Sequence, residues 1–271
     1  MKILFSTGSL FYLPLKEIFL IARDAGFDGC DLVVQSHLDD PYYKETLHEC
    51  IQILPVFAMH TPFLRLTSWG NQIEALIKCI EVAKEFGIGV VNFHPPSWFS
   101  MEIGFLKWFR GIKDFQRELR CEPVFLALEN MPLLAKSTKI NTYVLNTIDE
   151  IIRFGSQRNL YFTLDTTHAA TTGHDIIPTF LNLYKTGRLM HVHLSDYSRI
   201  GSHLFPGSGS LPIVKLLNTM RKMGYNQAIS LEVSPMQLPS AALPLKKVLW
   251  YAASFLKMHA GNELQEGEER G

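Results

Sequence analysis

The sequence predicts an α/β protein that folds as one closed barrel of eight parallel strands and eight helices, a (β/α)₈ barrel. Three observations predict this class. Eight short apolar runs alternate with longer amphipathic stretches along the chain. Several runs are almost wholly apolar, which is typical of parallel strands covered on both faces. The 271 residues are 47% hydrophobic and 19% charged, enough for one large core, and such barrels often reach this length as a single domain.

The expected strands are short and bounded by glycine, proline or polar residues. They are residues 3–6, 29–34, 55–59, 89–93, 124–128, 160–164, 189–194 and 228–233. A doubly wound open sheet is the alternative. It is disfavoured because no G-x-G-x-x-G pattern follows the first run, and eight repeats are the number of a closed barrel.

The expected helices lie between these strands, and each has one apolar face. They are residues 15–25, 42–53, 72–86, 102–119, 146–154, 175–185, 212–223 and 243–258. Pro212 suits a first helical turn, and Gly87 and Gly155 stand where a helix should end. We therefore expect residues 1–260 to form a single (β/α)₈ (TIM) barrel. Residues 261–271 are polar and are expected to form a disordered C-terminal tail.

Charge and cysteine content limit the classes of partner. Lys plus Arg and Asp plus Glu both number 26, so the chain has no general attraction to nucleic acid or to an anionic membrane. No apolar run is long enough to span a membrane. The four cysteines form no C-x-x-C pair and are interpreted as reduced thiols of a cytoplasmic protein. No nucleotide or organic cofactor is expected, and the sequence leaves open whether the chain forms a homo-oligomer.

Six successive expected strands, from the third to the eighth, each end in a side chain that can bind a metal. In a barrel of this class the carboxyl ends of the strands carry the active site. The six are His60, His94, Glu129, Asp165, His193 and Glu232, and His168 and His203 follow two of them in the chain. One histidine at a strand end is usually structural, but six such groups at one rim indicate a site.

The residue types favour a divalent metal. Imidazole nitrogens and carboxylate oxygens suit Zn²⁺, Mn²⁺, Fe²⁺ or Co²⁺, and a cation offsets the repulsion between carboxylates at one rim. Asp165 has an alternative role as the N-cap of a following helix. Its neighbours favour the ligand role, so the cap is expected at Thr166 or Thr167. His191 lies two residues before His193, on the same side of its strand. It is expected to be a hydrogen-bonded core residue or a partner behind the ligands.

These stretches resemble the xylose isomerase-like TIM-barrel superfamily over about residues 1–258. The motifs that carry the resemblance are ARDAGFDGCDL, MHTPFL, NFHP, LEN, LDTTHA, HVHLSD, HLFPGSG and LEV. The superfamily contains sugar and sugar phosphate isomerases and epimerases. It also contains the endonuclease IV type of AP endonuclease, or AP endonuclease family 2.

The isomerase and epimerase branch implies one divalent metal, Zn, Mn, Co or Mg, held by four side chains. The matching positions are Glu129, Asp165, His193 and Glu232. The two glutamates would act as acid and base on either side of a metal-stabilised enediolate, formed from a small sugar, a sugar phosphate or a related keto or polyol acid. The expected substrate contacts are His60, His94, His168, His203, Phe63, Trp98 and Asn130.

The endonuclease branch is the alternative and implies three zinc ions and an abasic DNA substrate. Its pattern would add His60, His94, His168 and His203 as ligands. Its ninth position, an aspartate, is Gly201 here, and Asp196 is the candidate replacement. The loop QSHLDDPYY after the second strand carries acids and no arginine, which disfavours DNA because phosphate contacts need Lys and Arg. A lyase or dehydratase of the same superfamily is a third interpretation.

Overall fold

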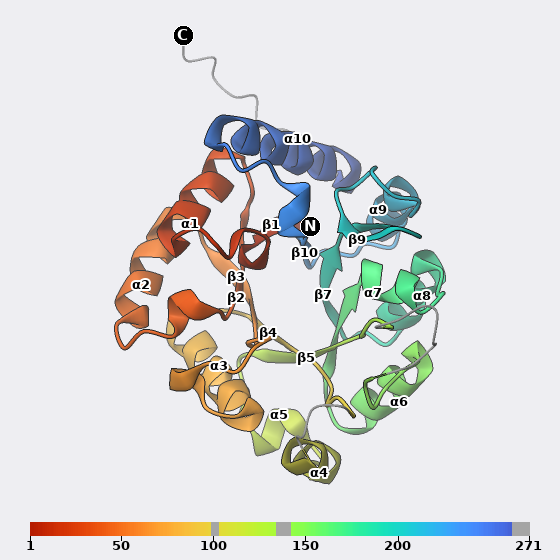
Figure 1. Ribbon diagram of the computed structural model, residues 1–271. Helices are drawn as coiled ribbons and strands as arrows, with labels where there is room; N and C mark the ends of the chain where they lie inside the picture. Colours follow the sequence, from red (N-terminus) through yellow and green to blue (C-terminus); the bar gives the residue numbers. More distant parts are fainter. Residues whose placement is uncertain (99–102, 134–141, 262–271) are drawn as a thin grey trace.

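The strands close into a barrel of eight, as the sequence predicts. The computed structural model describes residues 1–98, 103–133 and 142–261. The strand order is β1-β10-β7-β6-β5-β4-β3-β2, and neighbouring barrel strands pair in parallel (Figure 1). The barrel strands are β1 (Lys2–Ser6), β2 (Gly29–Val33), β3 (Val56–His60), β4 (Val90–Phe93), β5 (Phe125–Glu129), β6 (Tyr161–Asp165), β7 (Leu189–Leu194) and β10 (Ala228–Leu231).

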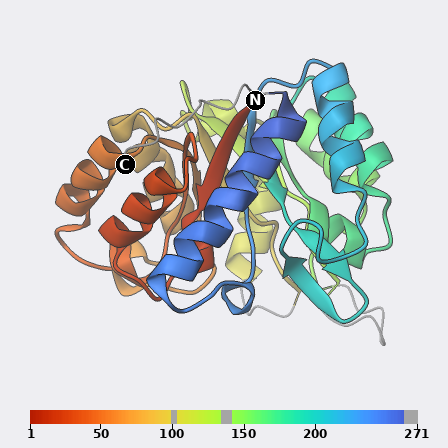
Figure 2. The ribbon, with the colours of Figure 1, turned by 90° about the horizontal axis from the view of Figure 1, so that it is seen from above.

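Helices surround the barrel and bury its outer face. They are α1 (Leu15–Asp24), α2 (Tyr43–Ile53), α3 (Gln72–Phe86), α4 (Ile103–Gly111), α5 (Phe115–Glu118), α6 (Ile148–Gln157), α7 (Thr166–Thr171), α8 (Ile176–Lys185), α9 (Ile213–Lys222) and α10 (Ala242–Ala260). The last helix, α10, packs against α1 and β1 and completes the ring (Figure 2). Within the described ranges, no helix is long and apolar enough to cross a membrane.

Local sequence sets the ends of α3 as expected. The Asn71 side chain accepts the backbone N–H groups of Ile73 and Glu74, and the Glu74 carboxylate accepts the N–H of Asn71, which together form a capping box. Gly87 ends the helix at φ 70°, in the left-handed region that glycine adopts most readily.

Two expected helices differ from the structure. Residues 102–119 hold two helices, α4 and α5, because Asp114 is extended and its side chain caps a new helix by accepting the N–H of Arg117. Gly155 lies inside α6 instead of ending it, and a Cβ there would come within 2.5 Å of the Phe162 ring. The start of the helix expected at residue 102 and residues 262–271 of the expected tail lie outside the described residues.

The sequence did not indicate a small antiparallel hairpin after β7. It consists of β8 (Asp196–Ser198) and β9 (Gly201–Leu204). Strands this short have no periodicity that a sequence pattern can detect. The hairpin carries His203 back toward the barrel.

The interior of the barrel has an apolar part and a polar part. Leu4, Ala58, Val90 and Ala127 form the apolar cluster. Other inward-facing positions are polar and fully buried, and they include Asp31, Asn92, Thr163, His191 and Ser230. Buried polar groups are stable only when bonded, so this part of the barrel holds side chains at defined positions below the rim.

Candidate metal centre

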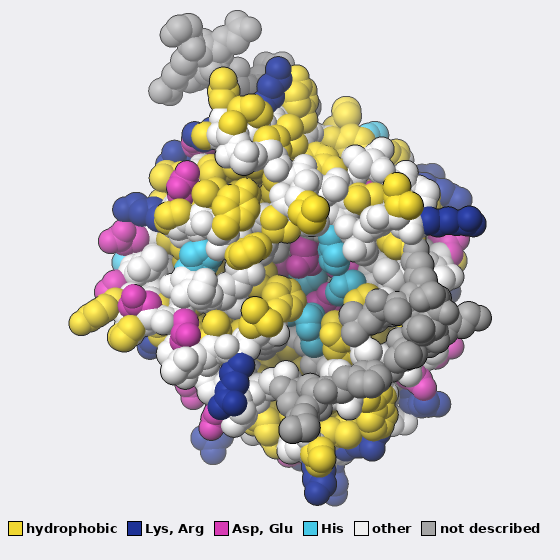
Figure 3. All heavy atoms as spheres, viewed as in Figure 1, with side chains coloured by type: hydrophobic (Ala, Val, Ile, Leu, Met, Phe, Trp, Pro, Cys, Tyr) yellow, Lys and Arg dark blue, Asp and Glu magenta, His cyan; other side chains and the backbone are white. Residues whose placement is uncertain are grey.

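The histidines and acids expected at the rim converge at the carboxyl ends of the strands. Figure 3 shows histidine and acidic side chains at the centre of this face, with apolar side chains beside them. Glu129 ends β5, Asp165 ends β6, and His193 lies in β7, and each is at most 1% exposed. The strand-end rule places these side chains together because parallel strands end at one rim.

Glu129 is the central residue of the site. Its Oε2 lies 3.0 Å from His60 Nε2 and 3.4 Å from His94 Nε2. Its Oε1 lies 3.2 Å from His168 Nδ1 and 3.3 Å from His193 Nδ1. One carboxylate thus faces four imidazole rings from four different segments of the chain.

His193 links both glutamates to the barrel interior. Its Nδ1 lies 3.3 Å from Glu129 Oε1 and 3.2 Å from Glu232 Oε2. Its Nε2 lies 3.0 Å from Asp31 Oδ2. Glu129, Asp165 and His193 each offer one ligand atom, and these three atoms lie within 4.8 Å of one another. This spacing suits one metal ion.

The unpaired atoms of the site test whether these residues fit a metal. Asp165 Oδ2, His193 Nδ1 and His94 Nε2 are buried and make no hydrogen bond of suitable geometry among the described residues, although the two nitrogens lie 3.2–3.4 Å from glutamate oxygens. An unpaired buried polar atom costs about 1–3 kcal/mol, so three at one place require an explanation. A divalent cation would satisfy carboxylate oxygens and imidazole nitrogens together. The side chains therefore fit a metal.

Asp165 serves as a helix cap and still has one oxygen available. Its Oδ1 accepts the backbone N–H of His168 at 2.6 Å, which makes it the N-cap of α7. The expectation that Thr166 or Thr167 would cap this helix is wrong. Cap and ligand are compatible because the carboxylate has two oxygens and Oδ2 is unpaired.

Two further groups flank this centre and correspond to the additional ligands that the sequence suggested. One group consists of His60, His94 and Glu129, and the other consists of Asp165, His168 and His203. His60 Nδ1 lies 2.7 Å from the Thr61 carbonyl oxygen, and His60 Nε2 is the nitrogen that faces Glu129. His168 Nδ1 lies 2.9 Å from the Asn130 carbonyl oxygen, and its ring lies 5.2 Å from that of His203.

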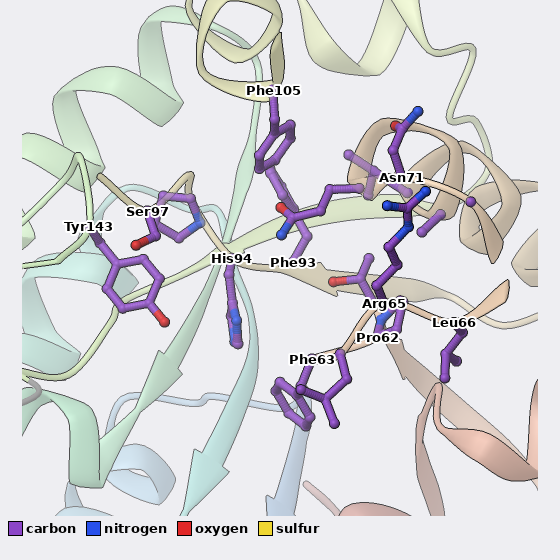
Figure 4. Close-up of a pocket in the computed structure, with 17 residues that line it drawn as sticks. Pro62, Phe63, Arg65, Leu66, Asn71, Phe93, His94, Ser97, Phe105 and Tyr143 are labelled. Carbon is purple, nitrogen blue, oxygen red and sulfur yellow. The ribbon is translucent and has the colours of Figure 1, made fainter. Parts of the chain in front are cut away.

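The expected substrate contacts lie in different settings. The Phe63 ring lies 4.6 Å from that of His60 and lines a cavity of about 360 Å³ beside His94 (Figure 4). Trp98 is half exposed, and the Arg110 guanidinium lies 5.4 Å from its ring centre. The Asn130 amide holds the end of β6, because it donates to the Asp165 carbonyl oxygen and accepts the Asp165 N–H.

Burial and close charges shift the pKa values of both glutamates. Burial raises the pKa of Glu129, but the surrounding histidines, His193 first, lower it by more, so it lies well below its usual range. Burial also raises the pKa of Glu232, and there the lowering effects of His193 and His203 are smaller, so the net shift is upward. Burial lowers the pKa of His193, but Glu232 and Glu129 raise it well above its usual value. A metal at Nδ1 would compete with that proton.

Asp31, a fully buried acid in β2, was not among the residues predicted for the site. Its Oδ2 lies 3.1 Å from His191 Nε2 and 3.0 Å from His193 Nε2. Burial raises the pKa of Asp31, but these two histidines lower it far below its usual range. The available signal was a single acid inside the apolar run GCDLV.

Asp196 does not replace the missing aspartate of the endonuclease pattern. Its Oδ2 accepts the N–H groups of Gly207 and Gly209 at 2.9 and 3.0 Å. Its Oδ1 accepts those of Tyr197 and Leu211 at 2.7 and 2.9 Å. All four bonds go to the backbone of its own loop, so the expectation that Asp196 could be a ligand is wrong.

Replacing Gly209 by Ala is expected to destabilise this loop. The added Cβ would lie 2.4 Å from Asp196 Oδ1 and 2.5 Å from the Tyr197 carbonyl oxygen, so the bonds around Asp196 must shift. We expect the free energy of unfolding to fall by about 1–3 kcal/mol, measured by urea denaturation. Ser208→Ala, at an exposed position of the same loop, is the control and should stay within about 0.5 kcal/mol. Equal stability of Gly209→Ala and the wild type would contradict the proposed role of Asp196.

Comparison of the sequence with protein families identifies the group to which the barrel belongs. Residues 19–255 match the family model described as xylose isomerase-like TIM barrel. An uncharacterized protein of Mycobacterium leprae is 26% identical over 286 residues, which cover 94% of this chain and 98% of the relative.

Solved structures with the same fold come from both branches of the superfamily. A D-tagatose 3-epimerase-like protein aligns with TM-score 0.68 at 22% identity, covering 95% of this chain and 99% of that one. The IolI protein, solved with a bound zinc atom, aligns with TM-score 0.67 at 17% identity, covering 96% and 98%. An AP endonuclease of family 2 from Brucella melitensis aligns with TM-score 0.70 at 14% identity, covering 94% and 98%. Similarity at these identities establishes the fold, and with the family match it shows that this chain belongs to the xylose isomerase-like TIM barrel family.

Proposed function

We propose that the protein is a metal-dependent isomerase or epimerase of a small polyhydroxy carbonyl compound, such as a sugar or a related keto or polyol acid. The observation that carries the proposal is the placement of two carboxylates. Glu129 and Glu232 approach the same His193 nitrogen from β5 and from the end of β10. In the barrel, β6 and β7 separate these strands, so the two carboxylates reach the centre from different parts of the rim.

This arrangement suits the transfer of a proton between two faces of one carbon. Glu129, Asp165, His193 and Glu232 would hold the metal, which is Zn, Mn, Co or Mg. When bound, the metal would polarise a substrate carbonyl and the adjacent hydroxyl and so acidify the C–H bond between them. One glutamate then takes the proton and the other returns one, as general base and general acid.

The surroundings of the site favour a small substrate over DNA. Within the described loops that follow the barrel strands, the basic residues are Arg65 and Arg199. Several large apolar side chains are exposed on these loops, and Figure 3 shows apolar side chains beside the mouth. They include Phe11, Tyr12, Phe63, Leu64, Trp98 and Met236. A surface that binds a DNA backbone needs several Lys and Arg side chains.

A metal-dependent phosphodiester hydrolase of the AP endonuclease type is the second candidate. The group of His60, His94 and Glu129 favours it, because Glu129 also belongs to the central group and could bridge two ions. Paired ions bridged in this way are common in phosphodiester hydrolysis. The absence of an aspartate at Gly201 and the four backbone bonds of Asp196 weigh against the full set of three zinc ions.

Proton exchange in heavy water tests the proposal without knowledge of the product. The metal-loaded protein is incubated in D₂O with a panel of ketoses, ketose phosphates and keto acids, and NMR follows deuterium at the carbon next to the carbonyl. We expect metal-dependent exchange into at least one compound and its epimer or isomer. Nicking of abasic duplex DNA, with no exchange into any compound of the panel, would overturn the proposal in favour of the hydrolase.

A further inference from the structure

A buried polar unit lies directly behind His193. It consists of Asp31, His191, His193 and Ser230, and each of the four is at most 1% exposed. His191 and His193 are two residues apart in β7, so both rings point into the barrel. Asp31 comes from β2 and Ser230 from β10, so the unit joins three strands.

Two imidazole nitrogens and one hydroxyl group meet at a single oxygen of Asp31. His193 Nε2 lies 3.0 Å, His191 Nε2 3.1 Å and Ser230 Oγ 3.1 Å from Asp31 Oδ2. Ser230 Oγ also lies 2.9 Å from His191 Nε2. Because the unit is buried, water cannot readily replace any of these bonds.

The chemistry of these groups determines where the His193 proton lies. An ionised carboxylate only accepts hydrogen bonds, so His193 Nε2 must carry the hydrogen that it shares with Asp31. In neutral imidazole the other nitrogen then carries a lone pair. That nitrogen, Nδ1, is the one that faces Glu129 and Glu232.

We propose that Asp31 is a positioning residue that holds His193 in its Nε2–H tautomer and directs the Nδ1 lone pair to the metal. Ser230 and His191 bond the same Asp31 oxygen and fix its position. The inference rests on the metal site of the proposed function. It adds a residue that would act through His193 and not as a ligand itself. Carboxylates behind metal-bound histidines act in this way in other metal sites.

One alternative for the same residues is a second metal ion. Asp31, His191 and His193 also offer atoms within 4.8 Å of one another. The two arrangements exclude each other, because His193 Nε2 cannot bind an ion and keep its hydrogen. The contacts of 3.0 and 3.1 Å have the length of ordinary hydrogen bonds, which favours the positioning role.

The first test reads the tautomer directly in the protein loaded with one equivalent of zinc. Long-range ¹H–¹⁵N NMR on protein with labelled histidines shows which ring nitrogens carry hydrogen, and a His193→Gln sample assigns the His193 signals by their loss. We expect a hydrogen on Nε2 and none on Nδ1. A hydrogen on Nδ1, or none on either nitrogen as an ion at Asp31 would require, overturns the proposal.

The second test measures zinc affinity by competition with a chelator. Asp31→Asn keeps the shape of the side chain but can donate to His193 Nε2, so the zinc dissociation constant should rise by about 10–100-fold. The control is Asp24→Asn, the same change at an aspartate of α1 that pairs with Arg23 and Lys246 outside this unit, and its affinity should stay within about threefold of the wild type. Thermal unfolding verifies that both variants fold.

Wild-type affinity in Asp31→Asn, or an equal loss in Asp24→Asn, would reject a specific role for Asp31 toward His193. If Asp31→Asn fails to fold, the tautomer measurement on the wild type still decides. Neither test requires turnover. If the protein binds zinc as expected but exchanges no substrate proton, the proposed function is therefore overturned and this inference still holds.

Discussion

Replacing Glu232 by Gln should lower the turnover number by about 10²–10⁴-fold, the usual contribution of one general acid or base. Glu232 is the glutamate that faces the mouth, with 15% of its side chain exposed against 1% for Glu129. Glutamine keeps the length and one oxygen of the side chain but cannot take up or release a proton at neutral pH. Steady-state kinetics on the best compound of the panel would measure the effect, with the metal content determined in parallel.

The matched control for this experiment is Glu17→Gln. Glu17 is an exposed glutamate of α1, outside the loops that form the mouth. It should leave turnover unchanged. Full activity in Glu232→Gln at normal metal content would remove Glu232 from the mechanism, and the proposal would then need another acid.

Adding the metal should raise the melting temperature of the apo protein by on the order of 10 °C. A ligand that binds only the folded chain stabilises it by about 4 kcal/mol at a thousandfold excess over its dissociation constant, and about 1 kcal/mol corresponds to a few degrees for a chain of this size. The shift should nearly vanish in Glu129→Gln, because Glu129 contacts four imidazole rings of the site. Differential scanning calorimetry with and without Zn²⁺ or Mn²⁺ measures it.

The control here is His48→Gln, at an exposed histidine of α2. It should keep the full shift, which would show that the effect depends on the site and not on histidines in general. If no divalent metal raises the melting temperature of the wild-type protein, the metal centre and the function proposed from it are contradicted.

The sequence was sufficient to predict the barrel and the composition of its rim. Both follow from short-range patterns, because apolar runs mark the strands and the first polar residue after each run marks its end. His60, Glu129 and Asp165 were placed together by topology alone, since parallel strands of one barrel end on one side. The hairpin of β8 and β9 and the break between α4 and α5 were not predictable in this way. A single cap at Asp114 and a few backbone pairs decide them.

The hydrogen-bond partners of the buried polar residues could be identified only from the three-dimensional structure. Asp31 is separated by 162 residues from His193 and by 199 from Ser230 along the chain, so no local pattern could connect them. Asn130 and Asp196 appeared to be candidates for binding, and the structure uses both for backbone contacts. Such bonds are decided by loop geometry, which composition does not record.

The shared carboxylate of Asp165 connects the site to the backbone of the chain. One oxygen is available to the centre, and the other is bonded to the amide of His168. Any ion that draws charge from Oδ2 weakens the acceptor at Oδ1. The His168 amide resonance and its hydrogen-exchange rate should therefore change as the site fills. This one N–H group gives the protein a spectroscopic reporter of metal occupancy that needs neither a substrate nor an added label at the site.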